Sequence, residues 1–253
     1  MDLGLSGKNA VVTGATRGIG RAIADLLADE GANLAICSRH QDEVDSAVEE
    51  LGAKGVKVVG GVVDVADKAT YQAWIASAGN DLGGIDIFVP NVSAGGGNMT
   101  EEGWQNNFNV DLLGTTRGIE AALPFLQKSG AASIVIISSS GAVETFLAPQ
   151  PYNAIKGALV VYGKQLSQAL APDGIRVNCI SPGPIFVEGG IWDIIKTNMT
   201  EVYDSTLAQI PRGQMGSAEE VANAVAFLAS PAASLITGVN LVADGGLTKR
   251  VQL

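Results

Sequence analysis

The sequence predicts an α/β fold in which one doubly wound parallel β-sheet carries helices on both of its faces. Two observations lead to this prediction. Short β-branched and apolar runs alternate with segments whose apolar residues recur at helical spacing, and short connections join them. A glycine-rich turn at 13–20 also separates the first run from the first helical segment, which is where such folds bind phosphates.

Each element is predicted from its own residues. Apolar runs predict strands at 9–12, 34–37, 56–63, 85–89, 134–137, 176–180 and 238–242. Apolar residues at helical spacing predict helices that include 19–27, 44–51, 74–82, 104–119, the segment that begins at Pro151, and 221–228. Ser217 and Glu220 form a capping box ahead of the last of these helices. No linker interrupts the pattern, so we expect a single domain over 1–253.

The segment 184–200 mixes glycines with large apolar side chains. This composition predicts a mobile lid over a substrate. The alternative is a peripheral helix that packs on the core.

Composition excludes several classes of function. The formal net charge of −10 argues against nucleic acid or an anionic membrane surface as a partner. No apolar run approaches the roughly 20 residues of a membrane span, and the N-terminus lacks the features of a signal peptide. Cys37 and Cys179 carry no motif, so we expect reduced, buried thiols in a cytoplasmic protein. His40 is the only histidine, which excludes a multi-histidine metal site, and we predict no bound metal.

The glycine-rich turn predicts a nucleotide site. It joins a strand to a helix, so its backbone N–H groups can approach a pyrophosphate at the positive end of the helix. A glycine-rich turn without a ligand is the alternative. The second strand ends in Ser38-Arg39, where an acidic residue would hold the ribose 2′-hydroxyl of NAD. Arg39 and Arg17 could instead pair with the 2′-phosphate of NADP, although Arg39 could also be an ordinary solvated charge.

A second candidate site follows the strand at 134–137. Three serines, 138–140, stand at its carboxyl end, where open α/β sheets place their sites. Pro151 then begins a helix on which Tyr152 and Lys156 are four residues apart and share one face. An ammonium beside a phenol stabilises the phenolate, and a serine hydroxyl could hold a substrate oxygen, so proton transfer is plausible here. By spacing alone, the pair is more typical of an ordinary helix start.

These motifs combine into a resemblance to a known family. In chain order they are Thr13-Gly14-x3-Gly18-x-Gly20, Asp64-Val65, Ser139, Tyr152-x3-Lys156, Pro182-Gly183 and Asp244-Gly245-Gly246. The sequence resembles the short-chain dehydrogenase/reductase family over nearly its whole length. The resemblance implies a single Rossmann-type domain that uses NAD(P)(H), and many relatives are tetramers that pack their fourth and fifth helices against a partner.

The resemblance also implies residue roles. Tyr152 would be the general acid and base, Ser139 would orient the substrate oxygen, and Lys156 would bind the nicotinamide ribose and stabilise the phenolate. Cofactor contacts are expected from Gly14, Arg17, Gly18, Ile19, Gly20, Ser38, Arg39, Asp64, Val65, Asn91, Tyr152, Lys156, Pro182 and Gly183.

Three positions depart from the family pattern. Pro90-Asn91-Val92-Ser93 stands where the family has Asn-Asn-Ala-Gly, and Val187 stands where a threonine often binds the carboxamide. Asp111 takes the place of an asparagine that completes a proton relay. We expect its carboxylate to point towards Lys156 through a water and to be ionised. The alternative is that it bonds a kink in its own helix.

The sequence therefore predicts an NAD(P)(H)-dependent oxidoreductase, with NADP(H) favoured, that interconverts a ketone or aldehyde and an alcohol. A non-catalytic NAD(P)-binding sensor or scaffold is the alternative, which the three departures support and the intact Ser139, Tyr152 and Lys156 oppose. We expect a homotetramer. A neutral, partly apolar substrate is predicted from a set of apolar side chains that could instead close the core or an interface: Phe146, Leu147, Pro149, Phe186, Ile191 and Trp192.

Overall fold

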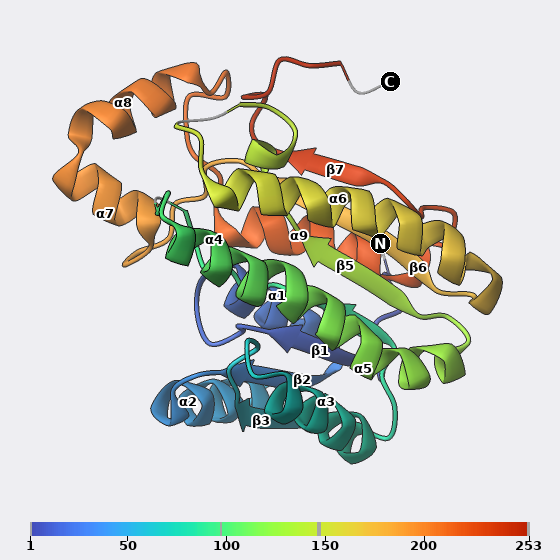
Figure 1. Cartoon of the computed structure of the whole chain (residues 1–253). Coiled ribbons are helices and arrows are strands. Elements are labelled where there is room, and N and C mark those ends of the chain that lie inside the picture. The colour runs from blue at the N-terminus through green and yellow to red at the C-terminus, as the bar shows by residue number, and fades with distance from the viewer. Residues whose placement is uncertain (1, 97, 146–147, 252–253) are drawn as a thin grey trace.

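The computed structural model describes residues 2–96, 98–145 and 148–251. Seven parallel strands form one sheet in the order β3-β2-β1-β4-β5-β6-β7 (Figure 1). The strands are β1 (Asn9–Thr13), β2 (Asn33–Ser38), β3 (Val58–Val62), β4 (Ile87–Val89), β5 (Ser133–Ile137), β6 (Arg176–Pro182) and β7 (Asn240–Ala243). The α-helices are α1 (Gly18–Asp29), α2 (Gln41–Gly52), α3 (Lys68–Leu82), α4 (Glu101–Asn107), α5 (Gly114–Ser129), α6 (Pro151–Leu170), α7 (Ile191–Asn198), α8 (Thr200–Gln209) and α9 (Ala218–Ala229).

Two apolar cores cover the two faces of the sheet. Successive side chains of a strand point to opposite faces, so Val12 packs with α1, α2 and α9, whereas its neighbour Val11 packs with α3, α5 and α6. Because both faces are covered, the central strands are apolar throughout, and β5 is buried along its whole length. The predicted fold class is confirmed: this is a Rossmann-type α/β sheet with helices on both faces.

The strand order positions the candidate site. β1 pairs with β2 on one side and with β4 on the other, so the direction of winding changes between β1 and β4. In open α/β sheets, ligands bind outside the carboxyl ends of the strands at such a point. The turn after β1 and the loop after β4 therefore form the floor of the site.

The helix predicted over 104–119 is not one regular helix. A π-helical segment, η1 (Phe108–Leu113), separates α4 from α5. Such wide turns in helices are rare and frequently lie at functional sites. Here the wide turn contains the buried Asp111, whose carboxylate accepts a hydrogen bond from the backbone N–H of Ala94 in a different segment.

The predicted lid segment forms helix α7, and α8 follows it directly. Trp192 of α7 is buried with Ile210 and Met215 in a small cluster of its own, whereas Ile191 and Ile194 are more than half exposed. Figure 1 shows α7 and α8 beyond the carboxyl ends of the strands, beside the start of α4. None of the helices in the described residues is long and apolar enough to cross a membrane.

Candidate functional site

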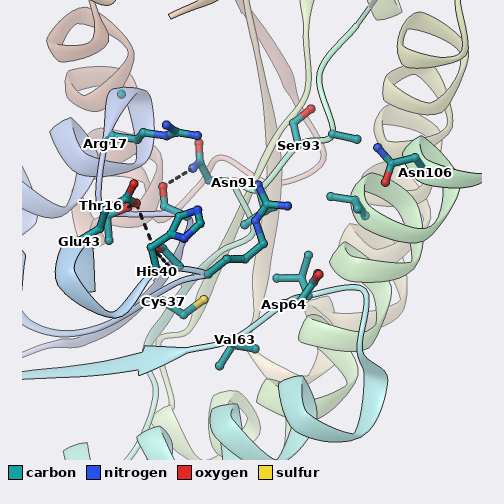
Figure 2. Close-up of a pocket in the computed structure, with 18 residues that line it drawn as sticks. Thr16, Arg17, Cys37, His40, Glu43, Val63, Asp64, Asn91, Ser93 and Asn106 are labelled. Atoms are coloured by element: carbon teal, nitrogen blue, oxygen red, sulfur yellow. Dashed lines mark hydrogen bonds between the residues drawn. The ribbon is translucent and has the colours of Figure 1, made fainter. Parts of the chain in front are cut away.

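A cavity of about 370 Å³ lies at the carboxyl ends of β1, β2 and β4. Figure 2 shows Thr16, Glu43 and His40 gathered on one side of it and Asn106 on the other. Eight of the residues predicted to contact a cofactor line the cavity: Gly14, Arg17, Gly18, Ser38, Arg39, Asp64, Val65 and Asn91. The remaining predicted contacts, at Ile19, Gly20, Tyr152, Lys156, Pro182 and Gly183, are not part of its lining.

Two glycines of the turn are required by its geometry. Gly14 has a φ of +65°, and a Cβ atom there would lie 3.0 Å from Cγ2 of Val92. At Gly20 a Cβ atom would collide with the carbonyl oxygen of Gly14, so only glycine lets α1 begin this close to the turn. The result is a tight backbone cradle at the N-terminus of α1, where partial positive charge favours a phosphate. These residues fit the pyrophosphate of a dinucleotide.

The loop after β4 is fastened to this cradle. The hydroxyl of Thr13 accepts a hydrogen bond of 3.0 Å from the backbone N–H of Asn91. The amide nitrogen of Asn91 donates in turn to the carbonyl oxygens of Thr13 (3.0 Å) and Gly14 (3.2 Å). The Asn91 side chain therefore holds the turn in place, even though the sequence around it departs from the family pattern.

The end of β2 forms a polar corner of the cavity. Ser38 donates a hydrogen bond to a carboxylate oxygen of Glu43, 3.4 Å away, and accepts one from the backbone N–H of His40. Arg17 and Arg39 are exposed, and neither forms a salt bridge with any residue that the structure describes. Two guanidinium groups without a salt bridge at this corner suit a phosphate group.

The opposite wall of the corner is made by the segment after β3. Asp64 accepts a hydrogen bond from the backbone N–H of Ala66, which shapes the turn, and Val65 is buried beneath it. Cys37 of β2 also lines the cavity, but the thiol is almost fully buried and burial raises its pKa to about 12. Cys37 therefore contributes an apolar, unreactive surface to the cavity.

Lys156 lies at the centre of a buried polar cluster. Its Nζ atom is 3.1 Å from Oδ1 of Asp111, and the two side chains are 2% and 0% exposed. The same ammonium donates a hydrogen bond of 3.0 Å to the carbonyl oxygen of Ile137 at the end of β5. It also lies 5.6 Å from the centre of the Tyr152 ring. The contact between Asp111 and Lys156 is direct, not through a water as the sequence reasoning expected.

Asp111 is surrounded by hydrogen-bond donors. Its Oδ2 atom accepts hydrogen bonds from the backbone N–H of Ala94 (2.9 Å) and from the amide of Asn107 (3.2 Å), and its Oδ1 atom faces the Lys156 ammonium. The two side chains thus form a buried ion pair whose acidic partner is fixed by two further hydrogen bonds.

The remaining predicted catalytic residues lie next to this cluster. Ser139 follows β5, and its hydroxyl accepts a hydrogen bond of 3.1 Å from the backbone N–H of Gly141. Ser138, one residue earlier, faces the other way and donates to the carbonyl oxygen of Lys156. Tyr152 and Lys156 both lie in the first turns of α6, and Tyr152 remains partly exposed. The structure thus brings Tyr152, Lys156 and Asp111 together, with Ser139 at the adjoining strand end.

The segment after β6 approaches the nucleotide cradle at Val187. Gly183 packs so closely on Asp244 that a Cβ atom would lie 2.6 Å from Cβ of Asp244, and its backbone N–H bonds to Ala243. Val187 approaches Gly18, because a Cβ atom on that glycine would be 4.0 Å from the valine side chain. The departure at Val187 therefore puts an apolar group over the nucleotide cradle.

The apolar walls predicted for the substrate are only partly described. Phe146 and Leu147 lie outside the described residues. Phe186 packs beside the cluster that contains Trp192, which supports the alternative that these two residues close a local core. Ile191 lies beside Trp192 in α7 and is 61% exposed, so it remains available to a ligand.

Sequence reasoning missed Glu43, His40, Asn106 and Asn107. Glu43 and His40 line the cavity because the first turn of α2 bends back towards Thr16, which is 27 residues away in the chain. A weak signal was available, since two acidic residues, Asp42 and Glu43, lie in the first turn of this helix shortly after Arg39. Asn107 carries no motif, and only the wide turn that follows it reveals its contact with Asp111.

Comparisons with known proteins agree with this geometry. The sequence model of a family described as enoyl-(acyl carrier protein) reductase matches residues 14–248. Isoepoxydon dehydrogenase of Penicillium expansum is 37% identical over 249 residues, which cover 96% of both proteins.

Solved structures show the same likeness. L-sorbose reductase of Gluconobacter frateurii, complexed with NADPH and L-sorbose, is 33% identical with a TM-score of 0.91, and the match covers 99% of this chain and 100% of that one. NAD⁺-bound xylitol dehydrogenase is 26% identical with a TM-score of 0.90, and the match covers 96% and 99% of the two chains.

Proposed function

The chain belongs to the short-chain dehydrogenase/reductase family and is an NAD(P)-dependent oxidoreductase of alcohol and carbonyl substrates, and from this premise we propose that it favours NADP(H) and that Ser139, Tyr152, Lys156 and Asp111 form its catalytic site. The observation that carries the catalytic assignment is the buried Lys156 ammonium beside the Tyr152 ring, held by Asp111 and the end of β5.

Each side chain has a distinct part in the reaction. A nicotinamide cofactor, whose pyrophosphate the glycine-rich turn at 13–20 would hold, would supply the hydride for reduction or accept it in oxidation. Tyr152 gives its phenolic proton to the carbonyl oxygen during reduction and takes it back during oxidation. Lys156 stabilises the phenolate electrostatically, and Ser139 holds the substrate oxygen. Asp111 acts through Lys156 and is a positioning residue, because it fixes the ammonium beneath the tyrosine.

The proposed preference for NADP(H) rests on the polar corner at the end of β2. Arg17 and Arg39 line it, and neither forms a salt bridge with a described residue. Charge-assisted hydrogen bonds from guanidinium to a 2′-phosphate are stronger than neutral ones. In addition, neither Ser38 nor Arg39 presents the carboxylate that typically holds the ribose of NAD at the end of β2.

A binding protein without catalysis is the alternative that the sequence alone left open. The sequence departures at 90–93 and at Val187 favour it, because both lie where relatives contact the cofactor. The intact Ser139, Tyr152 and Lys156 oppose it. Fluorescence titration with NADPH and NADH, followed by turnover with a panel of carbonyl compounds, separates the two: binding without turnover on any carbonyl would favour the sensor or scaffold.

The same panel addresses the substrate. We propose a neutral, partly apolar carbonyl compound that contacts α7, with 184–200 acting as its lid over the single domain. Ile191 and Ile194 support this, because both are apolar and largely exposed on that helix. Neutral ketones should therefore outperform small keto acids with several charges.

We further propose a cytoplasmic homotetramer. Trp104 of α4, Phe108 of η1 and Val161 of α6 are apolar and 45–60% exposed, on helices that could pack against a second copy. Sedimentation velocity would test the assembly, and a monomer at micromolar concentration would contradict it.

A further inference from the structure

Glu43 places a carboxylate in the polar corner of the nucleotide cavity. It lies in the first turn of α2, and one of its carboxylate oxygens, Oε2, is 2.9 Å from the hydroxyl of Thr16 and 3.4 Å from that of Ser38. Figure 2 shows it beside Thr16 on the side of the pocket where Arg17 and His40 also lie. Thr16 belongs to the turn after β1 and Ser38 ends β2, so the carboxylate joins both sides of the corner.

The carboxylate is charged at neutral pH. The hydrogen bond from Thr16, together with the nearby charges of Arg17 and His40, lowers the pKa of Glu43 below its usual value. Its negative charge therefore stands at the same corner as Arg17 and Arg39. In addition, the Ser38 hydroxyl donates to Glu43 over 3.4 Å, so a phosphate would compete with the carboxylate for that one proton.

We propose that Glu43 is a specificity-determining residue that weakens binding of the 2′-phosphorylated cofactor and leaves binding of the 2′-hydroxyl cofactor largely unchanged. A 2′-phosphate at this corner meets a like charge that opposes the two guanidinium groups. A ribose 2′-hydroxyl meets no such repulsion and finds an acceptor in the carboxylate. The inference rests on the proposed function only in placing the 2′-hydroxyl or 2′-phosphate of the cofactor at this corner. It predicts that removing the Glu43 charge shifts the preference towards NADPH, whichever cofactor the wild-type protein prefers.

The decisive variant is Glu43→Gln, which removes the charge and keeps an oxygen that can accept from Thr16 and Ser38. Asp42→Asn is the matched control, because Asp42 is an exposed acid in the same helical turn that does not line the cavity. Dissociation constants are measured by fluorescence for NADPH and NADH. Competition with 2′,5′-adenosine bisphosphate and 5′-AMP, which lack the nicotinamide and differ in the 2′-phosphate, measures binding at the corner alone.

In Glu43→Gln we expect NADPH and the bisphosphate to bind about tenfold more tightly, and NADH and 5′-AMP to change by less than about twofold. The gain should shrink when ionic strength rises from 0.05 M to 0.5 M, because salt screens charge–charge repulsion and would not alter a purely structural effect. The control should change all four constants by less than about twofold.

Three results would overturn the inference: an unchanged NADPH constant, equal gains for NADPH and NADH, or weaker NADPH binding, which would mean that Glu43 prepares the corner for phosphate. The two proposals also fail separately. A wild-type protein that prefers NADH refutes the proposed NADP(H) preference, yet a selective gain for NADPH in Glu43→Gln would still support the role of Glu43.

Discussion

The carboxylate of Asp111 lies 3.1 Å from the ammonium of Lys156, and both groups are buried. Removing only one partner of such a buried ion pair strongly destabilises the folded protein, because the other charge is left buried without compensation. An amide in place of the carboxylate can still accept hydrogen bonds. The pair has a direct consequence for Tyr152, because a neutralised ammonium stabilises a nearby phenolate less than a free one does.

Asp111→Asn should therefore shift the pH profile of alcohol oxidation. The lysine keeps its charge and loses the compensating carboxylate, so the phenolate forms more easily, and the rise of the rate with pH should move to lower pH. Activity should be retained. The check is kcat against pH at saturating cofactor and alcohol.

Two outcomes would contradict this account of Asp111. An unchanged profile would show that the carboxylate does not act on Tyr152 through Lys156. A complete loss of activity with intact folding would show that the negative charge itself is needed. Asp173→Asn is a suitable control, because that exposed carboxylate accepts a hydrogen bond from Gln127 and lies outside both the lid segment and the cavity lining.

Tyr152→Phe should lower kcat by about 10²–10⁴-fold, because the proton donor is lost while the ring and its contact with Lys156 remain. The NADPH dissociation constant should change by less than about threefold. Stopped-flow turnover and fluorescence titration measure the two quantities. Tyr162→Phe, ten residues further along α6, is the matched control and should retain activity within about twofold. Wild-type turnover by Tyr152→Phe would refute the assignment.

Arg39→Asp should raise the NADPH dissociation constant about 100-fold and change that of NADH little. The substitution removes charge-assisted hydrogen bonds and introduces repulsion of a 2′-phosphate. Lys128→Asp makes the same change in charge beside a different cavity, at the amino-terminal end of β1. It should leave the ratio of the NADPH and NADH dissociation constants unchanged. Parallel losses for both cofactors would show that Arg39 contributes general attraction and no selectivity.

Both thiols should be inert in the folded protein. Burial raises the pKa of Cys37 and of Cys179 to about 12, so at pH 8 only about one thiol in 10⁴ is the reactive thiolate. A disulfide reagent should detect neither cysteine within minutes in buffer and both in guanidinium chloride. Because the raised values favour the neutral thiol in the folded state, this contribution to stability is lost as the pH rises above about 9. Rapid labelling of one thiol in buffer would contradict the burial.

The sequence predicted the sheet because its signals are local. Apolar β-branched runs and helical spacing reflect burial on one face or both, and the glycine at 20 reflects a contact with Gly14 within a single turn. The details that it missed depend on segments far apart in the chain. The wide turn contains Asp111, which contacts Lys156 of α6. Glu43 lies at the cavity beside Thr16, whose hydroxyl donates a hydrogen bond to it. The spacing of apolar residues along the chain cannot predict contacts between such distant segments.

The Arg176 guanidinium should stabilise the fold. It donates hydrogen bonds of 2.7–3.2 Å to the carbonyl oxygens of Leu228, Ala229, Ser230 and Ile236, at and just after the C-terminus of α9. Arg176→Met removes these four bonds. The carbonyl oxygens of Leu228, Ser230 and Ile236 keep other donors, and that of Ala229 loses its guanidinium partner, so the free energy of unfolding should fall by about 1–3 kcal/mol. Arg212→Met is the control, since Arg212 forms an exposed ion pair with Glu220 and should cost less than about 1 kcal/mol. Guanidinium chloride unfolding followed by circular dichroism measures both. Equal losses in the two variants would show that the four carbonyl contacts contribute no more than one exposed ion pair.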